Sequence, residues 1–250
     1  MSETLEREIF WAVHNDLPRE GPGDDASTLR AFSMMQGLPA KPKILDIGCG
    51  AGPQTLALAR QTDANITAVD THQPFLDELS AKISQANFAE RIQLRNMSMF
   101  ELSFSEQFDA LWSEGAIYAM GFEEGLRVWR PLLKPGGYVA VTEISWLRAD
   151  VPSEVFSYWN AEYPGMRNIE ENLERLRRAG YREAGHFTLP ESAWWEPYYD
   201  PMQNRIAQLR KKYQGDAAAQ LLLEAHSKEV EMYCKYSAWY GYEFYVMQAA

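Results

Sequence analysis

One stretch constrains the fold of this chain more than any other, residues 43–56, KILDIGCGAGPQTL. Its first part, Ile44 to Ile47, is a short β-rich apolar run that suits a buried parallel strand. Three glycines follow at every second position, where side chains would obstruct a tight turn that a ligand approaches closely. Pro53 then favours a first helical turn, and the positive N-terminal end of that helix points back at the loop. Strand, glycine turn and helix together predict a nucleotide-binding site.

The spacing of the glycines separates the families of nucleotide-binding loops. A dinucleotide site requires G-x-G-x-x-G, but Pro53 occupies the position of the third glycine. A P-loop ends in Gly-Lys-Ser/Thr, and this loop does not. With Asp46 two residues before the first glycine, the run instead resembles D-x-G-x-G-x-G, the first motif of the class I S-adenosylmethionine-dependent methyltransferases.

Three later segments resemble the same family and follow in the same order. Residues 66–70 read as a second buried strand that ends in Asp70, roughly 20 residues downstream, where Rossmann-type folds place a carboxylate on the ribose hydroxyls. Residues 108–115 resemble the fourth strand of the family, and residues 132–141 resemble the turn into its fifth strand. The resemblance is strong over residues 43–147 and loose on both flanks.

The resemblance implies an α/β fold with a Rossmann-like seven-stranded mixed sheet, mostly parallel, with the last strand antiparallel and helices on both faces. We expect the sixth strand at residues 181–189 and the seventh at residues 242–247. The segment between them is too long for a bare loop and carries apolar residues at helical spacing. We therefore expect a single domain over residues 1–250, with an N-terminal helical cap at residues 1–40 and a helical lid insertion at residues 190–241.

The resemblance also implies S-adenosyl-L-methionine as the cofactor and S-adenosyl-L-homocysteine as the product. Asp70 is the expected ribose ligand, with a helix cap as its alternative role. The family usually has an acid near the adenine amino group, whereas this sequence has Ser98 there, followed by Met99 and Phe100, which could pack on the ring. The expected cofactor-binding residues are Asp46, Gly48, Cys49, Gly50, Gly52, Gln54, Asp70, Thr71, Ser98, Met99, Phe100 and Glu114, together with Arg19, Gly21 and Gly23 from an N-terminal segment that folds over the cofactor in many methyltransferases.

Methyl transfer from a sulfonium is an in-line displacement in which the cofactor supplies the activated group and the protein supplies position and a dry cavity. A base is needed only when the acceptor must lose a proton. The candidates at strand ends are Glu114, Tyr118, Glu143 and His186. For Glu114, holding a backbone amide or the cofactor ammonium is an equally good role.

Aromatic residues gather near the start of the expected insertion and after the fifth strand. Such rings either pack a lid against the sheet or enclose an aromatic or cationic small molecule. We expect an acceptor pocket formed by Trp146, Trp194, Trp195 and Tyr198.

Composition excludes several classes of function. A net charge of −11 disfavours nucleic acid as a partner. The signature of N6-adenine methyltransferases is missing after the fourth strand, where residues 113–116 read SEGA. Two cysteines and four histidines show no metal spacing, so we expect no metal. An acidic N-terminus without a signal-peptide pattern and the absence of an apolar span favour the cytoplasm and no membrane association.

The sequence therefore predicts a methyltransferase that acts on a small-molecule acceptor. One alternative is a protein side-chain methyltransferase, because an acidic body would not repel a basic peptide. Another alternative is a non-catalytic S-adenosylmethionine-binding protein. A weaker alternative is an NAD-dependent oxidoreductase, which Pro53 disfavours because it replaces the third glycine of a dinucleotide site. The sequence leaves open the acceptor, the methylated atom, the general base and the oligomeric state, for which a homodimer is one option.

Overall fold

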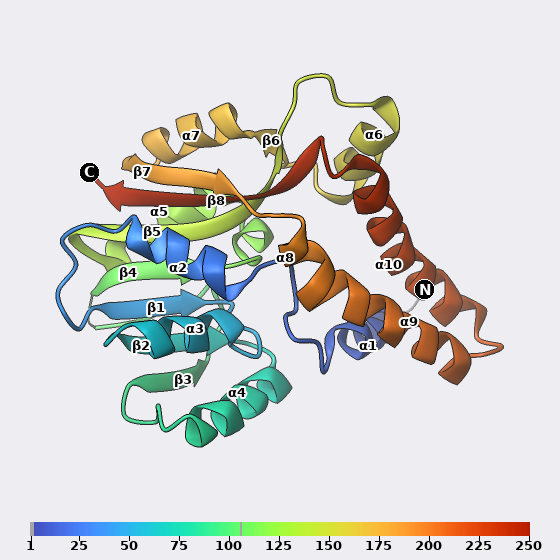
Figure 1. The fold of residues 1–250 in the computed structure, drawn as a ribbon, viewed down its shortest axis with the longest axis horizontal. Helices are drawn as coiled ribbons and strands as arrows, with labels where there is room; N and C mark the ends of the chain where they lie inside the picture. Colours follow the sequence, from blue (N-terminus) through green and yellow to red (C-terminus); the bar gives the residue numbers. More distant parts are fainter. Residues whose placement is uncertain (1–2, 106) are drawn as a thin grey trace.

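The computed structural model describes residues 3–105 and 107–250, and its centre is one twisted sheet (Figure 1). The main path of the sheet has the strand order β3-β2-β1-β4-β5-β8-β7. Strands β1 to β5 pair in parallel, whereas β8 runs antiparallel to its neighbours β5 and β7. The strands are β1 (Lys43–Ile47), β2 (Asn65–Asp70), β3 (Ile92–Asn96), β4 (Phe108–Ser113), β5 (Leu133–Trp146), β6 (Arg167–Asn168, paired with β5), β7 (Tyr181–Thr188) and β8 (Tyr240–Ala249).

Helices cover both faces of this sheet. Because side chains alternate along a strand, Ile44 and Leu45 of β1 pack into two different cores, and both are fully buried. Burying one such side chain stabilises the fold by about 1.5–3 kcal/mol. Helices α2, α3 and α4 close the Ile44 core, and α5 and α7 close the Leu45 core. Their bounds are α2 (Asp25–Ser33), α3 (Pro53–Gln61), α4 (Gln73–Gln85), α5 (Phe122–Trp129) and α7 (Ile169–Arg178).

A third layer of helices lies beyond the carboxyl ends of the parallel strands, on the right of Figure 1. Helix α1, near the N-terminus, packs there against α9 and α10, which come almost 200 residues later in the chain. This layer shares an aromatic-rich core with Ile144 of β5 and Tyr240 of β8. Its elements are α1 (Glu3–His14), α6 (Ser153–Glu162), α8 (Ser192–Trp194), the π-helical turn η3 (Trp195–Tyr199), α9 (Asp200–Lys212) and α10 (Ala217–Tyr236).

The predicted Rossmann-like mixed sheet is confirmed, including the antiparallel last strand. Two details differ from the prediction. The Pro135-Gly136-Gly137 segment lies inside β5, because the preceding helix ends at Trp129 and a 3-10 turn, η2 (Arg130–Leu132), leads directly into the strand. The sequence analysis also did not predict α6 and β6, since β6 is only two residues long and α6 is amphipathic only weakly.

Local signals set the two ends of α7. The Asn168 side chain accepts a hydrogen bond from the Glu171 amide at 2.9 Å, and the Glu171 carboxylate accepts one from the Asn168 amide at 3.0 Å. This reciprocal pair satisfies two amides that the first helical turn leaves unbonded. Gly180 follows the helix with φ of +87°, a conformation that favours glycine.

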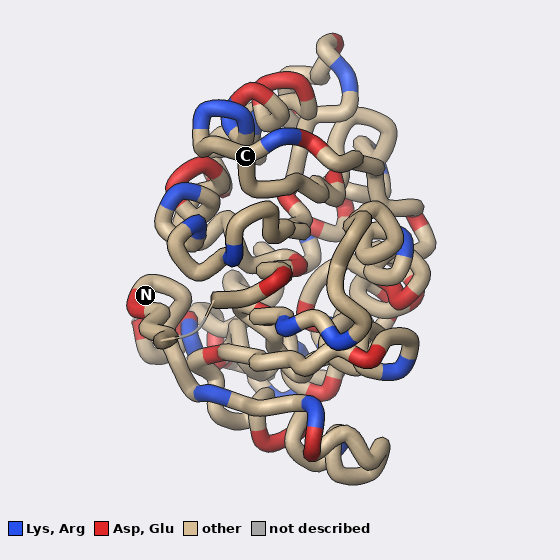
Figure 2. The backbone as a smooth tube through the Cα atoms, turned by 90° about the vertical axis from the view of Figure 1, so that its left-hand side faces the viewer, with Lys and Arg blue, Asp and Glu red and all other residues tan. Residues whose placement is uncertain are grey.

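Acidic and basic residues are interspersed along the backbone in the view of Figure 2. Within residues 3–105 and 107–250, no helix combines the length and the apolar character that crossing a bilayer requires.

Candidate active site

The loop between β1 and α3 has a backbone that requires glycine. Gly48, Gly50 and Gly52 have φ values of +72°, +54° and +75°. A Cβ atom at Gly48 would lie 2.5 Å from Cβ of Ala116, and one at Gly52 would lie 2.3 Å from the side chain of Leu79. Conformation and close packing together therefore explain the spacing of these glycines.

Two carboxylates hold this loop in place. Asp70 Oδ2 accepts a hydrogen bond from the Gly50 amide at 2.9 Å, and its Oδ1 accepts one from the His72 amide at 2.8 Å. Asp46 is fully buried and accepts a hydrogen bond from Thr55 Oγ1, which ties β1 to α3. Burial raises the pKa of Asp46 to about 7, against the lowering effect of the Thr55 hydroxyl. Asp46 therefore lies beneath the loop, whereas Asp70 reaches the space above it.

We name that space the loop cavity, and its volume is about 230 Å³. Gly48, Gly50 and Asp70 form one side of it, and residues 19–22 of the N-terminal segment form the opposite side. Further lining residues that the sequence predicted are Cys49, Gln54, Met99, Glu114 and Tyr118. The segment predicted to cover the cofactor thus faces the glycine loop.

A second hollow, the β3 cavity, has a volume of about 250 Å³ and adjoins the loop cavity. The two share Gly48, Asp70 and Met99 among their lining residues. Thr71, Ser98 and Phe100 also line the β3 cavity, so the residues predicted for ribose and adenine lie around two adjoining hollows.

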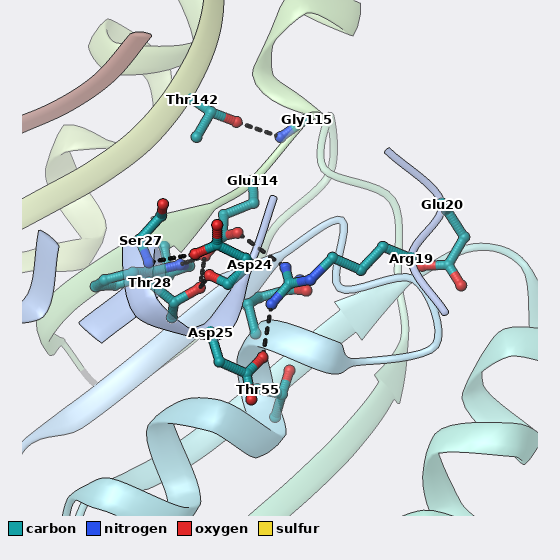
Figure 3. A network of polar contacts seen from close by, with 12 residues as sticks. Arg19, Glu20, Asp24, Asp25, Ser27, Thr28, Thr55, Glu114, Gly115 and Thr142 are labelled. Atoms are coloured by element: carbon teal, nitrogen blue, oxygen red, sulfur yellow. Dashed lines mark hydrogen bonds and ion pairs between the residues drawn. The ribbon is translucent and has the colours of Figure 1, made fainter. Parts of the chain in front are cut away.

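Glu114 anchors the N-terminal segment to the end of β4 (Figure 3). Its Oε1 accepts hydrogen bonds from Thr28 Oγ1 at 2.7 Å and Trp112 Nε1 at 2.8 Å, and its Oε2 accepts one from Arg19 Nη1 at 3.2 Å. Arg19 also pairs with Asp25 at 2.9 Å. Burial raises the pKa of Glu114, and the Arg19 charge opposes that shift. Since both oxygens are occupied, Glu114 suits an anchoring role better than that of a free base.

Glu20 follows Arg19 in the sequence. Its side chain points away from the hydrogen-bond network around Glu114, as Figure 3 shows. Its Oε2 accepts a hydrogen bond from the Ala51 amide of the glycine loop at 3.3 Å. A Cβ atom at Gly50 would lie only 2.4 Å from the same oxygen. Burial raises the pKa of Glu20 to about 7, partly offset by the Ala51 hydrogen bond. The sequence analysis missed this residue, because a single glutamate in a turn-rich segment carries no spacing signal.

A third hollow, the lid cavity, has a volume of about 280 Å³ and lies between the sheet and the third helical layer. Glu20, Gly21 and Tyr118 line both this cavity and the loop cavity, so the two adjoin. Two of the four residues predicted for the acceptor pocket, Trp194 and Tyr198, line it.

The other two predicted pocket residues, Trp146 and Trp195, do not line this cavity. Trp146 stacks on Phe156 with a centroid distance of 6.0 Å, and Trp195 packs against Tyr199 at 5.6 Å. Both residues fit the alternative role of the aromatic cluster, packing between lid and sheet. Trp195 points away from the cavity because neighbouring positions on a helical turn point in different directions.

Two further predicted residues also lie away from the cavities. His186 lies on β7 and pairs through Nδ1 with Glu243, and it lines none of the three hollows. Gly23 donates its amide to the Ala193 carbonyl at 3.0 Å and packs beside Arg19 and Glu114. We therefore remove His186 from the catalytic candidates and assign Gly23 to the fixing of the N-terminal segment.

The lid cavity also contains residues that the sequence analysis did not single out, namely Phe10, His14, Glu162, His226 and Glu229. They come from α1, α6 and α10, and only the tertiary fold brings these helices together. Among the described residues, no group of three or more His, Cys, Asp or Glu side chains is placed to hold a metal ion.

Comparison with known proteins agrees with this geometry. Residues 44–137 match the family model described as a methyltransferase domain. The sterol 24-C-methyltransferase erg-4 of Neurospora crassa is 24% identical over 185 residues, which cover 68% of this chain and 47% of that protein. The chain spans about half or less of the length of the curated relatives that it matches first.

Solved structures share the fold at low sequence identity. A methyltransferase from Thiobacillus denitrificans, solved in complex with S-adenosyl-L-homocysteine, superposes with a TM-score of 0.84 at 18% identity and covers 97% of this chain and 98% of its own. The [4+2]-cyclase SpnF superposes with a TM-score of 0.75 at 19% identity and covers 98% of this chain and 92% of its own. The match of residues 44–137 to a methyltransferase domain, the glycine loop and the shared fold confirm the predicted resemblance to the class I S-adenosylmethionine-dependent methyltransferases.

Proposed function

We propose that this chain transfers a methyl group from S-adenosylmethionine to a small-molecule acceptor. The observation that carries the proposal is the arrangement of two adjoining hollows at the carboxyl ends of the parallel strands, one over the glycine loop and one under the helical layer. Ligands of open α/β sheets bind at this edge. Two ligands in adjoining hollows can meet at the shared wall, as methyl transfer requires.

The residues of the loop cavity and the β3 cavity fit S-adenosylmethionine. Glycines with no room for a Cβ atom let the methionine part approach the loop backbone. Asp70 retains lone pairs for ribose hydroxyls beside its two backbone bonds, and the apolar Met99 lies between the two hollows, where it can pack on adenine. Glu20 offers a carboxylate to the ammonium group or to the sulfonium charge.

A cavity of about 280 Å³ lies at the lower end of the range for small-molecule sites, which supports a small acceptor. The names of curated relatives point the same way, since one is a sterol 24-C-methyltransferase and another a demethylmenaquinone methyltransferase. Trp194 and Tyr198 line this cavity as buried side chains.

The chain's own contribution to the reaction is position and the exclusion of water. The bound cofactor supplies the activated methyl group. Glu114 and Arg19 fix the N-terminal segment over the glycine loop, and Tyr118 lies where the two hollows meet. The helices of residues 192–236 act as the lid over the acceptor. We place Tyr118 at the reacting atoms and Glu114 as a positioning residue.

A thermal shift experiment with S-adenosylmethionine, S-adenosylhomocysteine and NAD in parallel tests the cofactor. A ligand that binds only the folded state at a hundredfold excess over Kd stabilises the protein by about 2.7 kcal/mol. We expect both sulfur nucleosides to raise the melting temperature and NAD to leave it unchanged. Stabilisation by NAD alone would favour the oxidoreductase alternative and overturn the proposal.

The fold by itself does not fix the reaction, since SpnF shares it and is a [4+2]-cyclase. A screen of metabolites with a labelled methyl donor separates a transferase from a non-catalytic binding protein, because only the transferase moves label into a product. Three properties stay predictions: a cytoplasmic location, the lack of nucleic-acid partners and a possible homodimer. Cell fractionation, a nucleic-acid binding assay and a sizing measurement test them.

A further inference from the structure

The lid cavity is lined by acidic side chains, without lysine or arginine among its described lining residues to balance them. Four carboxyl groups line it, and they come from four separate elements. Glu20 belongs to the N-terminal segment, Glu143 to β5, Glu162 to α6 and Glu229 to α10. No lysine or arginine is among the described residues that line the cavity.

Two of these carboxyl groups accept hydrogen bonds from tyrosine hydroxyls. Tyr163 donates its hydroxyl to Glu143 Oε1 at 2.7 Å, and Tyr199 donates its hydroxyl to Glu229 Oε1 at 3.0 Å. The second oxygen of Glu143 has no hydrogen-bond partner within the part of the chain that the structure describes, although the residue is only 1% exposed. A buried acceptor left unpaired destabilises the fold, so a bound donor that supplies the missing hydrogen bond gains that free energy.

Aromatic rings form most of the remaining wall. Trp159, Trp194 and Tyr198 line the cavity, and the indole N–H group of Trp194 has no hydrogen-bond partner among the described residues. The faces of such rings attract cations within about 6 Å of the ring centre. Rings and carboxyl groups together therefore select for positive charge and against anions.

The other titratable groups of the cavity do not supply a balancing charge. Burial lowers the pKa of His226 to about 4 and also lowers that of His14, so both imidazoles are neutral near pH 7. Burial raises the pKa of Glu143 and of Glu229 to about 7. Arg175 lies outside the cavity, where it donates to the Gly165 carbonyl. A cation that enters the cavity would return these carboxyl groups to their charged form.

We propose that the lid cavity binds an amine with an apolar body about the size of one aromatic ring, and that Glu143 takes the proton from its nitrogen. This inference rests on the proposed function, because the cavity is assigned to the acceptor only if the loop cavity holds the methyl donor. The nitrogen lies among the carboxyl groups, and the apolar body lies against Trp159 and Trp194.

The amine arrives as an ammonium ion. One N–H bond breaks, and its proton passes to the unpartnered oxygen of Glu143. The freed lone pair on nitrogen forms the bond to the methyl carbon while the carbon–sulfur bond breaks, and that electron pair stays on sulfur. The products are the N-methylated ammonium ion and S-adenosylhomocysteine, and Glu143 gives its proton to water when the product leaves.

The test uses two probes of the same shape and different charge, 3-hydroxyphenyltrimethylammonium and 3-tert-butylphenol. Each is titrated by calorimetry into the full chain saturated with S-adenosylhomocysteine. We expect the cation to bind at least tenfold more tightly than its neutral counterpart. Equal affinities, or tighter binding of 3-tert-butylphenol, would overturn the inference.

Substitutions of single glutamates test whether the preference for the cationic probe arises in the lid cavity. Glu143→Gln and Glu229→Gln should each reduce the ratio of the two affinities severalfold, whereas Glu196→Gln, an exposed residue of the same lid, should leave it unchanged. A ratio that falls equally in the Glu196 variant would show a general effect of net charge and overturn the assignment.

Proton release identifies the role of Glu143. Calorimetry at pH 6 in buffers of different ionisation enthalpy should show protons released when the cation binds, and Glu143→Gln should remove a large part of that release. Unchanged release in this variant would overturn the role of Glu143. Absence of S-adenosylhomocysteine binding is a different result, since it would refute the proposed function itself.

Discussion

The two ends of the ligand space are built in different ways. The loop cavity depends on backbone turns within residues 48–52 and on two carboxylates that hold them, all within the first third of the chain. The lid cavity depends on side chains from α1, β5, α6 and α10 and from the turn at residues 192–199. A backbone-built site binds the part of a ligand that is constant, and a side-chain-built site can change its specificity by substitution.

The strongest way to test this contrast is to block the backbone-built site. Gly50→Val should abolish detectable S-adenosylhomocysteine binding, because its φ of +54° disfavours a side chain and the new Cβ atom would collide with Glu20. Calorimetry on the folded variant measures the loss. Gly37→Val is the matched control, since Gly37 has a φ of +75° and open space around it. Retained binding in the Gly50 variant would show that the loop does not touch the ligand.

In the lid cavity, the pH dependence of the free energy of unfolding reports the raised pKa of the buried Glu143. Its folded pKa is about 7 and its ordinary value is 4.5, so the folded state binds more protons between these values and stability falls as pH rises through that window. Relative to Glu143→Gln, the wild type should lose about 3 kcal/mol of unfolding free energy between pH 4.5 and pH 8. Urea denaturation at both pH values measures the difference. The buried histidines titrate in both proteins and cancel, and parallel curves would contradict the prediction.

Asp70→Ala tests the assignment of the ribose. Charged hydrogen bonds contribute about 1.5–3 kcal/mol, so Kd for S-adenosylhomocysteine should rise roughly tenfold to a hundredfold. Asp77→Ala, on the exposed part of α4, is the control. The 2′-deoxy analogue separates ribose contact from loop anchoring, since it should bind the wild type more weakly and lose less in the variant. An unchanged Kd in a folded Asp70 variant would place the ribose elsewhere.

The smallest expected effect compares two neighbouring tryptophans. Trp194→Leu should weaken binding of 3-hydroxyphenyltrimethylammonium about fivefold, as expected for one lost cation–π contact of about 1 kcal/mol, and leave S-adenosylhomocysteine affinity unchanged. Trp195→Leu should change neither the affinity for the cation nor that for S-adenosylhomocysteine, because Trp195 does not line the lid cavity. Equal losses for both ligands in the Trp194 variant would place this ring against the cofactor instead.

The sequence predicts the residues of the loop cavity far better than those of the lid cavity. Glycines at 48, 50 and 52 meet a local backbone requirement, so their spacing is visible without any tertiary contact. The sheet order follows from the same resemblance. In contrast, Glu229 and His14 lie more than 200 residues apart and meet only because α1 packs against α10. No periodicity within either helix indicates that pairing, so the acceptor side needed the structure.

The wall shared by the loop cavity and the lid cavity has a thermodynamic consequence. Glu20, Gly21 and Tyr118 touch both spaces, so each ligand meets a surface that the other has already ordered. Linkage then requires reciprocity: the factor by which a bound nucleoside changes the acceptor's dissociation constant equals the factor by which the acceptor changes that of the nucleoside. Any cooperativity between donor and acceptor therefore acts through the residues that line both cavities, Glu20, Gly21 and Tyr118 among them.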